Sequence, residues 1–290
     1  MRSACPLCDD TGWKPTEENL STGSAQAVRR VVRCDCWREK LGRNSLADAD
    51  IPKRYQHCTL NNVRAYNDSL RQAVDKARRF VDGFPGKADR GLLFVGLAGV
   101  GKTHIAVGVL RGVIEKTGVQ GLFYDTRELL TKIKSSYDPV IRTSSTNILR
   151  PVMETRLLVL DDLGAERPTD WVEETMNLIV NTRYNERLMT LFTSNYPNVP
   201  DMEDPNSLLC RIGFRMRSRL QEMCSTVEID AADFRDEDKS PNASDNDLVN
   251  LWKSTKRPKD LPSRAGRGIK AHIRGDGKAD LKWPGGRAGN

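Results

Sequence analysis

The sequence lacks any apolar run long enough to cross a bilayer, and its first residues, "MRSACPLCDD", lack the apolar core of a signal peptide. Both absences exclude membrane-embedded and secreted classes of protein, so we expect a cytoplasmic chain with no membrane partner. Disulfides are disfavoured as well, because the cytoplasm keeps thiols reduced. Clustered cysteines among the seven in this chain of 290 residues therefore indicate metal binding more than disulfides.

Acidic residues are scarce at the C-terminal end. Residues 240–290 contain eleven Lys or Arg against five Asp and no Glu, so most of the net charge of +7 lies there and the rest of the chain is close to neutral. A basic chain favours a polyanionic partner, although charge alone does not show that the body binds nucleic acid. Beyond about residue 236 the apolar periodicity is lost, and "KRPKDLPSRAGRGIK" is rich in Pro, Gly and basic residues. Residues 236–290 are therefore predicted to form a basic, largely disordered tail.

Between residues 67 and 235, short apolar runs alternate with helical patterns, which predicts an α/β fold with a parallel sheet covered by helices on both faces. Asn67 is the candidate N-cap of the first helix, because apolar residues recur at helical spacing after it. Further helices are expected from residue 101, over 126–136, about 146–154 and 171–187, and over "RIGFRMRSRLQEM". The five expected strands are 91–96, 119–125, 156–161, 188–194 and 225–230.

The stretch "GLAGVGKTH", residues 96–104, follows an apolar strand, opens a helix and matches the phosphate-binding motif G-x-x-x-x-G-K-[ST]. Its glycines let backbone amides face the phosphates at the positive end of the helix. We expect Lys102 to reach the β and γ phosphates of ATP and the Thr103 hydroxyl to ligate Mg²⁺. An ordinary Gly-rich turn is the alternative. The predicted ATP-binding residues are Gly96, Gly99, Gly101, Lys102, Thr103, His104 and Asp161.

The segment "RLLVLDDLGAE" supplies the carboxylates that such a site needs. Asp161 ends an apolar strand and is expected to hold Mg²⁺ through water. Asp162 follows at the rim, where many hydrolysing P-loop proteins carry a Glu that polarises the attacking water; the shorter Asp implies a shifted water or slow turnover, and capping of the next turn is the alternative. Asn195 ends the strand "TLFTSN" and would lie near the γ phosphate if that strand neighbours the Asp161 strand. Its alternative role is to begin a loop.

The segment "RIGFRMRSRL" places Arg211, Arg215 and Arg219 one helical turn apart, on one face. Such a row is either a solvated face or a source of positive charge for another molecule. It precedes the last expected strand, where an arginine of a P-loop domain can reach the nucleotide of a neighbouring subunit and stabilise transition-state charge.

Two close cysteine pairs stand near the N-terminus: Cys5 with Cys8 as C-x-x-C, and Cys34 with Cys36 as C-x-C. Four thiolates in two pairs suit tetrahedral Zn²⁺ in a closed structural site. A polar segment of about 50 residues has little core of its own, so a metal would supply the missing folding energy. Unligated thiols on a flexible arm, or a redox pair, are the alternatives.

In order along the chain, "CPLCDDTGW", "CDCW", "IPKRYQHCTL", "GLAGVGKTH", "LLVLDDLGAE", "TSNY" and "RMRSRLQEM" resemble motifs of the bacterial replicative helicase loaders of the DnaC/DnaI group. Their ATPase core is similar to that of the IstB-type transposition helper. The resemblance covers roughly residues 1–235. It implies an AAA+ ATPase that assembles with like subunits or on a ring helicase, binds single-stranded DNA and delivers a replicative helicase in an ATP-dependent way. The implied division is a zinc-binding, helicase-docking region (1–50), a linker (51–66), the AAA+ domain (67–235) and the tail (236–290).

The resemblance also implies residue roles. Asp161 and Asp162 correspond to the Walker B motif, Asn195 to sensor 1, and Arg215 or Arg219 to the arginine finger. In these loaders a helical insertion before the Walker B strand faces DNA. Basic side chains and one aromatic side chain in that interval suit a DNA single strand that is bound through its phosphates and by base stacking, although a solvated helix face explains these residues almost as well. The residues in that interval are Lys132, Lys134, Tyr137, Arg142 and Arg150.

Two departures from the loader pattern keep other functions open. Asp162 replaces the usual Glu, which favours a nucleotide-gated DNA-binding module with little hydrolysis. The tail has no counterpart and is either an electrostatic DNA tether or a solubilising extension. A transposition helper would share the core, but the cysteine region favours the loader. A small-molecule kinase would need an Arg-bearing lid over the phosphates, and the sequence shows no clear lid.

Overall fold

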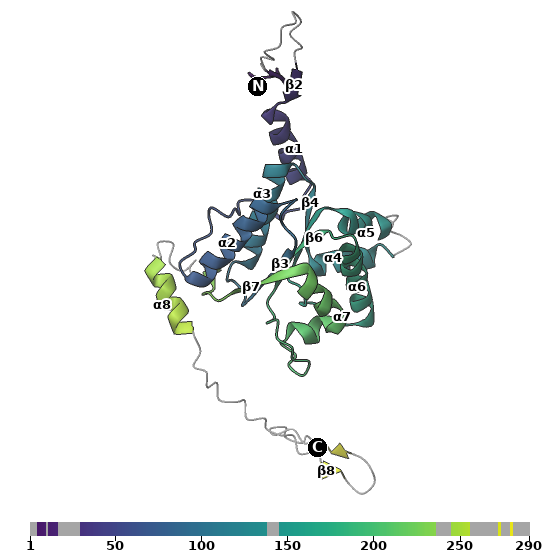
Figure 1. Cartoon of the computed structure of the whole chain (residues 1–290). Helices are drawn as coiled ribbons and strands as arrows, with labels where there is room; N and C mark the ends of the chain where they lie inside the picture. Colours follow the sequence, from purple (N-terminus) through teal and green to yellow (C-terminus); the bar gives the residue numbers. More distant parts are fainter. Residues whose placement is uncertain are drawn as a thin grey trace, which may run out of the picture.

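The computed structural model describes residues 5–9, 11–16, 30–137, 145–235, 245–255, 272–273 and 279–280. Five parallel strands form its central sheet in the order β4-β5-β6-β3-β7. This confirms the predicted five-stranded parallel sheet, with small shifts at the strand ends (Figure 1). The strands are β3 (Gly91–Gly96), β4 (Gly121–Asp125), β5 (Leu157–Asp161), β6 (Met189–Ser194) and β7 (Cys224–Ile229).

Helices cover both faces of the sheet (Figure 1). On one face lie α2 (Asp68–Gly83) and α3 (Lys102–Thr117); on the other lie α4 (Thr126–Ser135), α5 (Ser145–Glu154), α6 (Asp170–Asn185) and α7 (Leu208–Met223). Along β3, Leu92 and Phe94 belong to the first core, while Leu93 and Val95 belong to the second. Because the central strands are buried on both faces, their sequences are the continuous apolar runs that predicted them.

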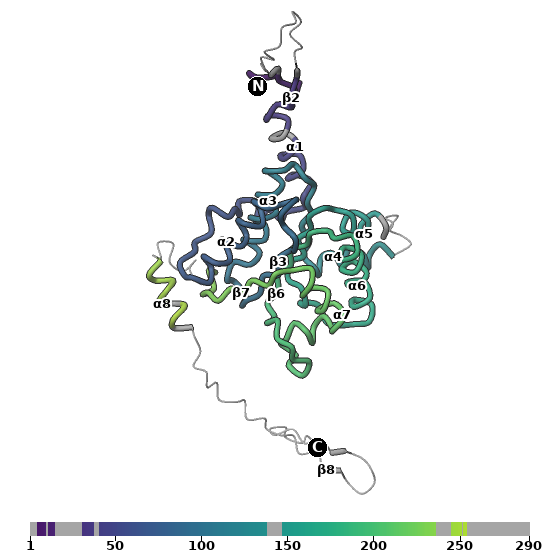
Figure 2. The backbone as a smooth tube through the Cα atoms, in the orientation of Figure 1, coloured from purple at the N-terminus to yellow at the C-terminus, as the bar shows by residue number. Residues whose placement is uncertain are grey.

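The N-terminal segment extends away from the core (Figure 2). In it, β1 (Trp13–Thr16) pairs antiparallel with β2 (Arg30–Arg33), and α1 (Asp35–Ala47) follows and packs against α3. We call the described residues from Cys5 to Ala47 the cysteine arm. The 3-10 turn η1 (Lys53–Tyr55) lies in the linker that joins this arm to α2.

Beyond residue 236 the structure contains helix α8 (Asp245–Thr255) and the short pair β8 (His272–Ile273) and β9 (Ala279–Asp280). Helix α8 corrects part of the tail prediction, because residues 245–255 were expected to be disordered and form a helix instead. Leu248 is buried in the core that contains α2, and the Trp252 indole donates to Oδ1 of Asp230 at 3.1 Å. A few apolar residues in a polar helix of 11 residues make a weak periodic signal, so the sequence pattern did not indicate it. The rest of the tail prediction lies outside the described residues.

Among the helices that the structure describes, none has both the length and the apolar character that crossing a membrane requires.

Candidate nucleotide-binding site

The P-loop connects β3 to α3 and borders a cleft of about 730 Å³. Gly99 and Gly101 have φ angles of 78° and 96°, in the left-handed region that favours glycine. Gly101 is the N-cap of α3, so the free amides and the positive end of the helix lie at the cleft. This local geometry suits a phosphate group.

Lys102 is buried in this cleft, with 6% of its surface exposed. Its Nζ donates to the carbonyl oxygens of Gly96 and Leu97, at 2.9 and 2.6 Å, and to Oδ1 of Asn195 at 2.6 Å. Burial lowers the pKa of Lys102 to about 8, and nearby carboxylates oppose this shift. An ammonium group held by neutral oxygens alone is well placed to exchange them for phosphate oxygens.

Two hydroxyl groups meet at Asp161, the last residue of β5. Oγ1 of Thr103 donates to Oδ1 at 2.8 Å and lies 3.1 Å from Oδ2, while Oγ1 of Thr193, on β6, donates to Oδ1 at 2.6 Å. Burial raises the pKa of Asp161, and the two hydroxyl donors oppose the rise. Carboxylate and hydroxyl oxygens are the hard ligands that Mg²⁺ prefers, so Thr103 and Asp161 fit the predicted metal. No sequence motif marks Thr193, because only the pairing of β5 with β6 brings it to Asp161.

Asn195 joins Lys102 to Asp162 through two hydrogen bonds. Its Nδ2 donates to Oδ1 of Asp162 at 2.5 Å while its Oδ1 accepts from Lys102. The two strands are neighbours, which is the condition under which Asn195 was expected near the γ phosphate. Asp162 has a φ of 58°, and its N–H donates to Oγ1 of Thr193 at 2.9 Å. Because Asp tolerates left-handed backbone better than most residues, this turn favours Asp over the longer Glu.

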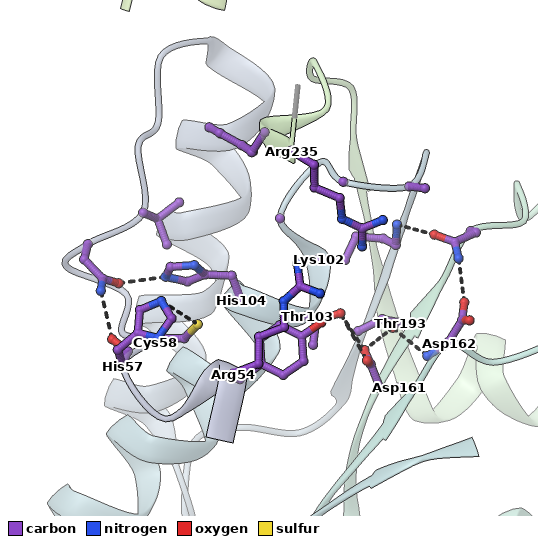
Figure 3. Close-up of a pocket in the computed structure, with 18 of the residues that line it drawn as sticks. Arg54, His57, Cys58, Lys102, Thr103, His104, Asp161, Asp162, Thr193 and Arg235 are labelled. Carbon is purple, nitrogen blue, oxygen red and sulfur yellow. Dashed lines mark hydrogen bonds between the residues drawn. The ribbon is translucent and has the colours of Figure 1, made fainter. Parts of the chain in front are cut away.

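Two arginines that no motif identified also line the cleft: Arg54, from η1, and Arg235, which follows β7 (Figure 3). The second is held near the P-loop because the N–H of Phe234 donates to the Gly99 carbonyl at 3.1 Å. His104 borders the same cleft, but its ring contacts the linker. No sequence signal marks these arginines as nucleotide ligands, since they come from segments outside the phosphate-binding motif.

The arginines of α7 do not line this cleft. Arg211 donates to a backbone carbonyl and to the Tyr196 hydroxyl, at 2.9 and 2.8 Å. Gly213 has φ and ψ of 77° and 165°, so the helix is kinked there and the expected single face is broken. Arg215 is exposed and Arg219 is half-buried on the segment after the kink.

The residues expected to face DNA differ in whether their side chains are paired or exposed. Lys132 and Arg150 each form an ion pair with a Glu four residues away on the same helix, at 2.8 and 3.0 Å. Lys134 and Tyr137 are exposed. Arg142 lies outside the described residues.

The four N-terminal cysteines converge, with all sulfur atoms within 4.8 Å of one another. The Sγ atoms of Cys8 and Cys36 are 3.1 Å apart, and those of Cys5 and Cys34 are 3.9 Å apart. Zn–S bonds of about 2.3 Å put the sulfurs of a tetrahedral site about 3.8 Å apart, so this cluster fits Zn²⁺. The hydrogen bond between the two thiols lowers the pKa of Cys8 to about 7 and raises the pKa of Cys36, so without a metal this pair shares one proton, which a bound metal would displace.

The parallel sheet, the P-loop and the carboxylates at the end of β5 define the class of protein: a P-loop nucleotide-binding protein with an AAA+ fold. Residues 85–241 match the family described as IstB-like ATP binding protein, and the chain belongs to this family, on its DnaC/DnaI-type loader branch. The chain is 25% identical to the replicative helicase loader DnaC of Escherichia coli strain K12 over 209 residues, which are 72% of this chain and 78% of that protein.

Solved structures agree with this assignment. A crystal structure of the DnaC helicase loader is 36% identical, with a TM-score of 0.55 over 61% of this chain and 99% of that chain. A DnaI crystal structure is 28% identical, with a TM-score of 0.52 over 62% of this chain and 95% of that chain. DnaA from Aquifex aeolicus, at 17% identity and a TM-score of 0.53 over 71% of this chain and 62% of that chain, shares the fold.

Proposed function

We propose that this chain is an ATP-dependent replication factor that loads a replicative DNA helicase onto single-stranded DNA. One observation carries the proposal. The chain is 36% identical to a DnaC helicase loader and covers 99% of that structure. In this chain, Lys102, Thr103 and Asp161 line the same cleft, where Lys102 donates to Asn195 and Thr103 donates to Asp161. These are the side chains that ATP with Mg²⁺ requires.

Each side chain of the cleft has one task in this proposal. The P-loop amides and Lys102 bind the β and γ phosphates. Thr103 and Asp161 hold Mg²⁺, which neutralises phosphate charge when bound. Asp162, oriented by Asn195, accepts a hydrogen bond from the attacking water. Because Asp162 is one methylene shorter than Glu, we expect slow hydrolysis.

The partners attach at three other places. The N-terminal region (1–50), with its four cysteines on Zn²⁺, docks on the helicase. Subunits associate with one another or on the helicase ring, so that Arg215 or Arg219 reaches the nucleotide of a neighbour. The exposed Lys134 and Tyr137 suit phosphate contact and base stacking with single-stranded DNA.

Steady-state ATP hydrolysis of the full chain, with and without single-stranded DNA, tests the enzymatic part of the proposal. We expect slow turnover that DNA stimulates, and none in Lys102→Ala. A wild-type chain that fails to bind ATP would contradict the proposal.

A nucleotide-gated DNA-binding module with little hydrolysis is the second candidate, and the left-handed Asp162 in place of Glu favours it. ATP binding without turnover, with or without DNA, would select this candidate. The family match over residues 85–241 keeps an IstB-like transposition helper as the other alternative, and a transposase is then the partner to test.

A further inference from the structure

The linker between the cysteine arm and the ATPase core forms one wall of the nucleotide cleft. Arg54, Tyr55, His57, Cys58 and Asn62 line the cavity together with P-loop residues. The phosphate-binding motif does not include this segment, so only the fold places it at the site.

This wall is fixed to α3, the helix that begins at the P-loop. Oδ1 of Asn62 accepts from the N–H of Thr59 at 2.9 Å, and Nδ2 donates to a linker carbonyl at 2.8 Å, which closes a tight turn. The same Oδ1 lies 2.7 Å from Nε2 of His104, in the first turn of α3. A Cβ added at Gly108 would lie 2.9 Å from the backbone nitrogen of Leu60, so the linker backbone packs directly on the helix. The wall is therefore preorganised.

Arg54 differs from other arginines near this wall. Arg64 pairs with Asp245 at 3.1 Å, and Arg111 pairs with Glu115 at 3.2 Å. Within the part of the chain that the structure describes, the Arg54 guanidinium makes no hydrogen bond or ion pair. Figure 3 shows its side chain extending from the linker toward the P-loop. The Arg54 side chain is solvent-exposed, and its Cζ lies over the Tyr55 ring, 5.9 Å from the ring centroid. Its N–H donors are therefore open to an anion that enters the cleft, and a planar guanidinium can bind a phosphate group through two of them.

The cleft contains several carboxylates that a triphosphate must approach. Asp125, Asp161 and Asp162 line it, the P-loop contributes the cation Lys102, and Arg235 adds a second cation from the segment after β7. Arg54 stands on the linker side of the cavity, outside the motif, and adds positive charge there.

We propose that Arg54 is a phosphate-binding residue, supplied by the linker of the same chain, that selects the triphosphate over shorter nucleotides. The bound phosphates connect the linker to the P-loop. The mobility of the linker that leads to the cysteine arm therefore depends on whether ATP is bound. This inference rests on the proposed binding of ATP.

The test compares full-length wild type with Arg54→Ala, Arg54→Lys and the neighbouring control Lys53→Ala. Lys53 is an exposed cation on the same turn and does not line the cleft. Calorimetry measures the Kd of ATP and AMP, and hydrogen exchange follows residues 51–63 at saturating ATP. We expect Arg54→Ala to raise the Kd of ATP about tenfold and that of AMP less than about twofold, because a charged hydrogen-bonding pair is lost only with the outer phosphates. Arg54→Lys should lie between, and Lys53→Ala should match wild type.

Hydrogen exchange provides a second readout. ATP should slow exchange of the linker amides in wild type and not in Arg54→Ala, even when both proteins are saturated. An unchanged Kd of ATP in Arg54→Ala, with ATP bound by wild type, would overturn the inference and leave the proposed function standing. An equal loss for ATP and AMP would also overturn it, because the wall rather than a phosphate contact would then be damaged. A wild type that binds no ATP would overturn the proposed function itself.

Discussion

The P-loop core and the cysteine arm are stabilised in different ways. Two apolar clusters fill the core on either side of the sheet, and their strand residues are almost completely buried. In the described part of the arm, the buried apolar positions are Cys8 and Cys34, while Leu7, Trp13 and Val31 are exposed. Burial of apolar surface stabilises the core by about 25 cal/mol per Å², and the arm has too little of it to fold in this way. The comparison predicts that the arm needs a metal on its four converged cysteines to fold and that the core does not.

Loss of a metal ligand should produce the largest effect. We expect Cys34→Ser to abolish zinc binding and to unfold the part of the arm that precedes the contact of α1 with α3, because structural zinc contributes on the order of 10 kcal/mol to such segments. ATP binding by the core should persist. Zinc stoichiometry and hydrogen exchange over residues 30–37 measure the first effect, and calorimetry with ATP measures the second. Cys210→Ser, which lies outside the cluster, is the matched control. An arm that stays protected without zinc would contradict the comparison.

The second prediction concerns Thr193, which orients Asp161 inside the core. Thr193→Val removes the 2.6 Å hydrogen bond to the carboxylate and keeps the shape of the side chain. We expect about a tenfold lower kcat and a higher Mg²⁺ requirement, with zinc retained in the arm. Thr193→Ser should restore both. Equal kinetics of the Val and Ser variants would show that the hydroxyl does not position Asp161.

The third and smallest effect is a gain in stability. Burial lowers the pKa of Lys102 to about 8 from 10.5, so the folded apo-protein binds this proton less tightly than the unfolded chain does. The free energy of unfolding of wild type therefore rises between about pH 8 and pH 10.5 on account of this group. Lys102→Met should lack this rise, be more stable by about 1 kcal/mol at pH 7, and fail to bind ATP.

Denaturant unfolding at pH 7 and pH 9.5 measures this prediction. The difference in unfolding free energy between wild type and Lys102→Met should shrink at the higher pH. A difference that grows with pH would contradict it.

The sheet could be predicted because its strands are buried on both faces and form unbroken apolar runs, as "LLVLD" does for β5. Their spatial order could not be predicted, since it depends on which strands pair. Helix α8 was missed because few of its residues are apolar, and the kink at Gly213 was missed because glycine inside a helical pattern does not by itself reveal its φ angle.

The residues of the site also differ in whether the sequence could predict them. Lys102, Thr103 and Asp161 follow from contiguous motifs whose spacing reflects their chemistry. Thr193 and Arg54 do not, because strand pairing and the packing of the linker on α3 bring them to the cleft. Residues that act through tertiary placement leave no local pattern in one sequence.

Transfer of the purified replicative helicase of the same organism onto single-stranded DNA tests the central claim most directly. The assay compares wild type with Asp161→Asn, in ATP and in ADP. The account predicts that wild type with ATP captures the helicase and places it on DNA, and that Asp161→Asn does not complete the transfer. Failure of wild type to capture the helicase with either nucleotide, or equal transfer by the two proteins, would contradict it.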